Sequence, residues 1–138
     1  MIEMSVDGLE GLMADMRRAK EIPPGVLKDM VQAQADVTEK AMVYNAGTML
    51  QGPYYEGAVA ASVKAGKPRV SKSGASVTIK FEGTQHGNRL AEIAFINEYG
   101  KKSQPARPFI KKATREAQDP GADKARVILD RFLSSKGL

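Results

Sequence analysis

The stretch from residue 26 to 50 sets the scale of the fold, because apolar side chains recur there every three or four residues. This spacing predicts one long helix with a single face on a core. Gln34 and Thr48 are the polar exceptions in the stripe. Pro23-Pro24-Gly25 precedes the helix and Gly52-Pro53 follows it, and such residues interrupt helices. The full stripe is Leu27, Met30, Gln34, Val37, Ala41, Tyr44 and Thr48.

Two shorter elements are predicted before this helix. Residues 2 to 6 alternate apolar and polar side chains, which indicates a short strand. Leu9, Leu12, Met13 and Met16 then recur at helical spacing, so we expect a first helix that ends near Lys20.

Beyond the long helix, residues 58 to 82 predict strands. The clearest runs from Ser76 to Glu82, where apolar and polar side chains alternate. Val59, Val63 and Val70 indicate shorter strands before it. The polar, basic segment 66–74 is expected to form the tip of a long hairpin.

Residues 92 to 99 fit two periodicities. Ile93, Phe95, Asn97 and Tyr99 would share one strand face, whereas Ile93, Ile96 and Gly100 would share a helix face, so we expect a strand or a short helical turn. C-terminal helices are expected from about 108 to 135. Pro108 suits a first helical position, and Asp119-Pro120 has the pattern of an interruption and restart.

Helices, then antiparallel strands, then helices predict an α+β fold in a single domain over residues 1–138. We expect a small antiparallel sheet of three or four strands. The long helix from the N-terminal half and the C-terminal helices would pack against it. A chain of 138 residues has the usual size of one domain.

The residue types argue against an enzyme. The chain has no cysteine and one histidine, His86, which excludes disulfides and disfavours a zinc site. No serine lies in a Gly-x-Ser-x-Gly pattern, and no phosphate loop is present. We therefore expect neither catalysis nor a cofactor. No apolar run approaches a membrane span, and the acidic start does not match a signal peptide, so a cytoplasmic protein without membrane contact is expected.

Positive charge is concentrated near the C-terminus. Residues 101–138 hold ten Lys or Arg against four Asp or Glu, a balance of +6, and residues 1–100 hold 11 against 12, a balance of −1. This asymmetry is consistent with a surface that binds nucleic acid or an acidic partner. It is equally consistent with a helix face that is simply exposed to solvent. Earlier in the chain, four cations in the predicted hairpin are candidate contacts for nucleic acid, namely Lys64, Lys67, Arg69 and Lys72.

One segment carries a resemblance to a known family. Glu98, Tyr99 and Gly100 end an apolar segment, and after a polar loop the helix opens with Pro105, Ala106, Arg107, Pro108 and Phe109. The combination resembles the phage neck and tail-completion family typified by gene product ten of lambda-like long-tailed phages. Lys101 departs from that pattern, since the family often has a small hydroxyl residue there.

The resemblance implies a structural virion protein of a tailed phage or prophage, a neck or tail-completion subunit that joins head and tail. Identical copies would form a closed ring of roughly six subunits. The expected partners are head-completion proteins, tail-terminator or tail-tube proteins and, weakly, genomic DNA. The subunit would lie in the host cytoplasm during assembly and then in the virion. A small basic nucleic-acid-binding module is the alternative, and an enzyme of unrecognised type is a second rival.

The motif also has a physical interpretation of its own. Gly100 permits a positive φ, Pro105 and Pro108 restrict the backbone, and Phe109 is suited to fill the core beneath. Arg107 would reach back to Glu98 as a charge-assisted pair that closes the loop. Two roles stay open for these residues: a joint between loop and helix, or a contact between subunits.

Overall fold

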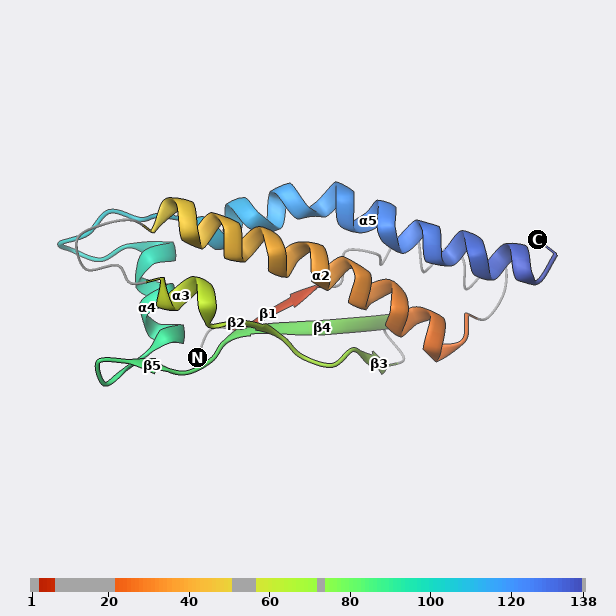
Figure 1. Cartoon of the computed structure of the whole chain (residues 1–138), viewed down its shortest axis with the longest axis horizontal. Coiled ribbons are helices and arrows are strands. Elements are labelled where there is room, and N and C mark those ends of the chain that lie inside the picture. The colour runs from red at the N-terminus through yellow and green to blue at the C-terminus, as the bar shows by residue number, and fades with distance from the viewer. Residues whose placement is uncertain (1–2, 7–21, 51–56, 72–73, 138) are drawn as a thin grey trace.

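Two long helices lie side by side over a small sheet in the computed structural model, which describes residues 3–6, 22–50, 57–71 and 74–137 (Figure 1). Helix α2 spans Pro24–Met49 and helix α5 spans Phe109–Ser135, so each is about 40 Å long. They run antiparallel (Figure 1). The α+β class with helices packed on a small antiparallel sheet is confirmed. The predicted first helix ending near Lys20 lies outside the described residues.

The sheet is built around β4, Gly74–Phe81, whose partners are all antiparallel. Strand β1, Glu3–Val6, pairs along one side of β4. Strands β2, Val63–Ala65, and β3, Arg69–Ser71, pair with it one after the other on the remaining side. The predicted short N-terminal strand and the clearest strand are therefore confirmed. Strands β5, Thr84–Gln85, and β6, Asn88–Arg89, form a separate small hairpin.

Two parts of the predicted strand region differ in the structure. Residues Ala58–Ala61 form a helical turn, α3, so the strand prediction around Val59 is wrong. Three of the four residues are alanine, the strongest helix former, and Val59 lies in the core one turn before Val63. The segment 66–74 is not only a hairpin tip, because it contributes β3 to the sheet.

Residues Leu90–Tyr99 form helix α4, so of the two alternatives predicted for 92–99 the strand is wrong and the helical one is confirmed, in a longer form than a single turn. The buried side chains of α4 recur at helical spacing and include one charged residue: Leu90, Ala91, Ala94 and Glu98. This buried face differs from both the strand face and the helix face expected from the sequence. The helix is oriented so that its alanines are buried. The sequence-based prediction considered only large apolar residues and so did not identify this face.

Helix α5 is continuous through Pro120, so the predicted restart at Asp119-Pro120 is wrong. Proline removes one intrahelical hydrogen bond and bends a helix, and Figure 1 shows α5 bending near its middle. Packing on α2 along both halves keeps the helix intact. Ala113 and Ala117 are buried before the bend, and Ala125 and Leu129 after it.

The buried face of α2 drifts away from the stripe expected from the sequence. Leu27, Met30 and Gln34 are buried as predicted, but Tyr44 is 66% exposed and Thr48 is exposed. The expected stripe followed a strict 3.5-residue repeat, whereas an α-helix turns every 3.6 residues and drifts by about 20° per heptad. The buried face therefore continues through other side chains: Ala35, Thr38, Met42, Asn45, Ala46 and Leu50.

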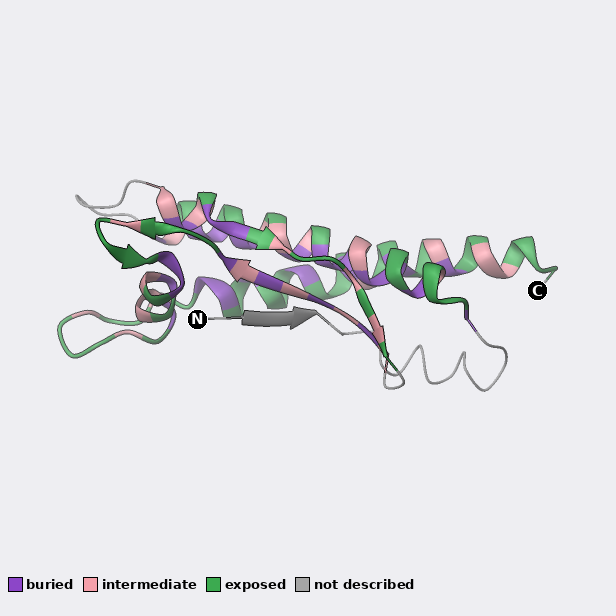
Figure 2. Ribbon diagram, turned by 90° about the horizontal axis from the view of Figure 1, so that it is seen from below, coloured by how far each residue is buried: buried purple, intermediate pink, exposed green. Residues whose placement is uncertain are grey.

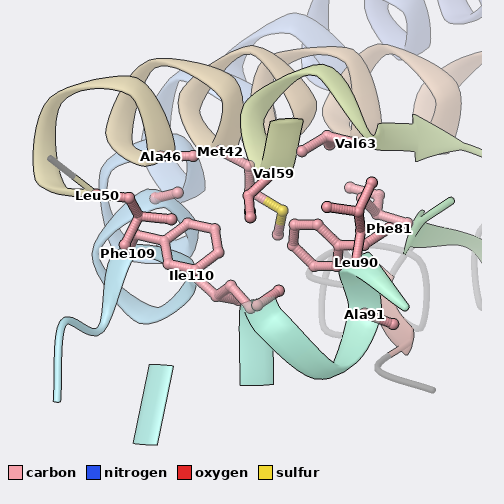
Figure 3. Close-up of a cluster of buried hydrophobic side chains, with 13 residues drawn as sticks. Met42, Ala46, Leu50, Val59, Val63, Phe81, Leu90, Ala91, Phe109 and Ile110 are labelled. Carbon is pink, nitrogen blue, oxygen red and sulfur yellow. The ribbon is translucent and has the colours of Figure 1, made fainter. Parts of the chain in front are cut away.

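Buried apolar side chains form two clusters along the molecule, and Figure 2 shows the buried stripe on the two long helices and β4. The first, in Figure 3, joins the C-terminal half of α2 to β4, α4 and the start of α5, with Phe81 and Phe109 edge to face at 5.8 Å. The second joins the N-terminal half of α2 to β4 and the far half of α5 through Met30, Val77 and Leu129.

A close contact between the long helices lies at Gly121 of α5. A Cβ atom there would lie 2.9 Å from the Cγ of Gln34, which is buried on α2. Thr38, also buried, donates its hydroxyl to the Gln34 carbonyl at 3.0 Å. A glycine at 121 therefore lets α5 approach a polar stretch of α2 that neither apolar cluster includes.

We expect Gly121→Ala to lower the free energy of unfolding by about 1–3 kcal/mol, because the added methyl overpacks against Gln34. Gly47→Ala is the matched control: it is an exposed helical glycine with open space around its Cβ, so it should stabilise by up to about 1 kcal/mol. Urea denaturation measures both. Stabilisation by both substitutions would contradict the close approach.

Candidate functional site

The carboxylate of Glu98 caps helix α5 from outside that helix. Its Oε2 accepts the backbone N–H of Ile110 at 2.8 Å, and its Oε1 accepts the N–H of Lys111 at 3.0 Å. First-turn N–H groups have no partner within their own helix, and no side chain at the N-cap of α5 supplies one. The buried Glu98 therefore satisfies two donors at once and joins the end of α4 to the start of α5.

The loop between these helices is held by its own hydrogen bonds. Lys101 and Gln104 exchange two backbone hydrogen bonds of 2.9 Å, which closes a tight hairpin. Asn97 binds this loop twice: its carbonyl accepts the N–H of Arg107 at 2.6 Å, and its side chain accepts from Gln104 at 3.0 Å. The loop is thus ordered by contacts with the last turn of α4.

Gly100 ends α4 in a conformation that other residues rarely adopt. Its φ is +77°, and its N–H donates to the Ile96 carbonyl at 2.7 Å. A Cβ at this position would lie 2.8 Å from the backbone N of Ala106. Both the turn and the close approach of the returning chain therefore require glycine.

The structure brings together the residues that carry the family resemblance. Phe109 is fully buried in the first cluster, as predicted, and Pro108 immediately precedes the first residue of α5. Arg107 is half-buried, and the remaining loop residues Pro105 and Ala106 are exposed. The contacts shown for Glu98 run to the backbone of α5, and its pairing with Arg107 stays a prediction. Most of the motif therefore builds a joint.

Two aromatic side chains lie on the outer face of α4: Tyr99, which belongs to the motif, and Phe95, which the sequence did not identify as a site residue. Phe95 is 51% exposed and Tyr99 is 69% exposed, and their rings lie 4.8 Å apart. They are four residues apart, so they share a helix face. The four-residue spacing could have indicated this aromatic face from the sequence. It indicates a shared face, however, only once the segment is known to be a helix.

The candidate nucleic-acid contacts between residues 64 and 72 belong to the region of β2 and β3. Lys64, Lys67 and Arg69 are exposed, and Lys72 lies outside the described residues. In Figure 1 the loop after α4 lies at the left end of the molecule, whereas β3 lies to the right. Arg69, on β3, therefore lies in a different part of the molecule from the loop after α4.

No group of three or more His, Asp or Glu in the part of the chain that the structure describes is placed to hold a metal ion. Arg89, the last residue of β6, forms an exposed ion pair with Glu92 in the first turn of α4, and the hydrogen bond from Arg89 lowers the pKa of the Glu92 carboxyl. No helix among the described residues is both long and apolar enough to cross a bilayer.

Comparison with protein-family models, with curated proteins and with solved structures finds no match to this chain.

We expect Glu98→Gln to lower the free energy of unfolding by about 1–3 kcal/mol, because an NH₂ group then faces one of the two backbone N–H donors that the carboxylate accepts. Glu92→Gln, which removes an exposed carboxylate from the same helix, should leave the melting temperature nearly unchanged. Thermal melting followed by circular dichroism compares the two. Equal effects would show that Glu98 contributes no more than a surface charge.

Gly100→Ala should destabilise the protein by more than the cost of its backbone conformation. Gly87→Ala is the control, because Gly87 has a φ of +81° with open space around it, so alanine there costs about 1–2 kcal/mol from conformation alone. At Gly100 the contact with Ala106 adds to that cost. Equal midpoints of urea denaturation would contradict the close approach.

Proposed function

We propose that this chain is a structural subunit of a tailed phage or prophage particle, a neck or tail-completion protein that joins head and tail. The segment from Glu98 to Phe109 supports the phage assignment through its resemblance to that family. Two of its residues, Glu98 and Gly100, have specific structural tasks in the joint between α4 and α5.

The observation that carries the assembly role is the exposed ring pair of Phe95 and Tyr99. Large aromatic side chains are enriched in protein interfaces, where they bury much area at a small cost in conformational entropy. Here the pair lies on a helix whose end is fixed by Glu98, so the rings project from a rigid support. A rigid aromatic face is suited to a neighbouring subunit.

The proposed assembly is a ring of identical copies. Each copy would place its α4 face on a different surface of the next copy, a head-to-tail arrangement that closes into a ring when the rotation fits. The joint also lies at one end of the molecule in Figure 1, where a contact between neighbours does not require the long helices to separate. Head-completion and tail proteins would contact the faces of the ring.

Light scattering over a concentration series, followed by electron microscopy of any large species, tests this proposal. The wild-type chain should form rings of roughly six subunits. Replacement of both Phe95 and Tyr99 by serine should shift the population to monomer, because both rings are exposed and their loss leaves the core intact.

Val127→Ser is the matched control, since Val127 is 49% exposed on α5 and lies outside the aromatic face. It should assemble like the wild type. A wild-type chain that stays monomeric throughout the series, or a double variant that assembles normally, would contradict assembly through this face.

A further inference from the structure

All of the excess charge in the C-terminal part of the chain lies in fifteen residues. Residues 101–115 contain six Lys or Arg and no Asp or Glu, whereas residues 116–138 contain four of each and are balanced. The fifteen residues are the loop after α4 and the first two turns of α5. The structure thus places the surplus at one end of the molecule (Figure 1).

Four of these cations project into solvent: Lys101, Lys102, Lys111 and Arg115 are all exposed. No ion pair within the described part of the chain involves any of them. Lys112 is different, because it lies 3.6 Å from Glu116, and Arg107 is half-buried. The four exposed cations are named here the joint cations.

The contacts that build the joint also fix the backbone that carries the joint cations. Lys101 begins the tight hairpin, and Lys102 follows it at the turn. Glu98, three residues before Lys101, accepts the N–H of Lys111, which connects the base of the hairpin to α5. Arg115 lies one turn after Lys111 on the same helix face. The backbone beneath the charges is therefore fixed before a ligand arrives.

The surroundings of the joint cations favour phosphate over a protein surface. Apart from the cations, the exposed residues among 100–115 are serine, threonine, alanine and proline, so no large aromatic or aliphatic side chain lies between the charges. Protein interfaces are depleted of lysine at their centres, yet three of the four cations are lysine. Lysine is a frequent phosphate ligand, which it binds as a point charge.

We propose that the joint cations bind the phosphate backbone of nucleic acid without reading its sequence. This inference does not depend on ring formation or on the phage assignment, since it rests on charge and placement alone. Each neutralised phosphate releases condensed counterions, so four contacts predict that log K falls with log salt at a slope of about −3.6 on duplex DNA. Binding would be weak at physiological salt and much tighter at low salt.

Fluorescence anisotropy with a labelled duplex of about 20 base pairs tests the site. The titration is repeated at salt concentrations from about 25 to 200 mM, over which counterion release changes the affinity strongly. Lys101→Gln with Lys102→Gln, and Lys111→Gln with Arg115→Gln, should each reduce the slope by about 1.8. The same measurement with a single strand of equal length distinguishes binding to single-stranded from binding to duplex nucleic acid. On a single strand the slope should be nearer −0.7 per contact.

Two control variants remove the same charge elsewhere. Lys124→Gln with Arg126→Gln lies in the balanced part of α5 and is the neutral control. Lys64→Gln with Lys67→Gln tests the rival candidate contacts near β2; the proposal predicts no change of slope from either variant. Circular dichroism confirms that each variant is folded. An equal loss in either control, or binding to polyglutamate without binding to DNA, would overturn the proposal.

Discussion

The buried carboxylate of Glu98 determines how the second half of this protein is arranged. It binds the first free N–H groups of α5 while belonging to the last turn of α4, so one side chain fixes both the start of a long helix and its direction. The alternative would be a buried helix end with unsatisfied donors, which costs about 1–3 kcal/mol per group. Phe109 enters the core beside this contact and anchors the same helix.

The joint separates two tasks within a short segment. Groups that face inward build structure: Glu98 binds the helix end, Gly100 accepts the returning chain and Phe109 packs against Phe81. Groups that face outward have no such task in the described structure, including the rings of Phe95 and Tyr99 and the joint cations. The proposed ring contact rests on these exposed aromatic rings, and the proposed phosphate site rests on these exposed cations.

Sequence periodicity predicted the long helix and the strand β4, because both segments have a long, regular pattern of apolar residues. The order of these elements along the chain then predicted the fold class. It could not predict where the buried face of α2 drifts, since burial of Ala35 and Ala46 depends on close helix packing. The role of Glu98 was also beyond it: the backbone partners lie twelve and thirteen residues away, and only the tertiary structure brings them together. Continuity through Pro120 likewise follows from tertiary contacts with α2.

Amide hydrogen exchange measured by NMR tests the Glu98 cap most directly. Lys111 and Glu92 occupy equivalent first-turn positions of α5 and α4 and both are exposed, but only the Lys111 N–H is bonded to a carboxylate. First-turn amides without a partner exchange readily. The cap predicts that the Lys111 amide exchanges much more slowly than that of Glu92, and that Glu98→Gln removes most of the difference. Equal, rapid exchange at both amides in the wild-type protein would contradict it.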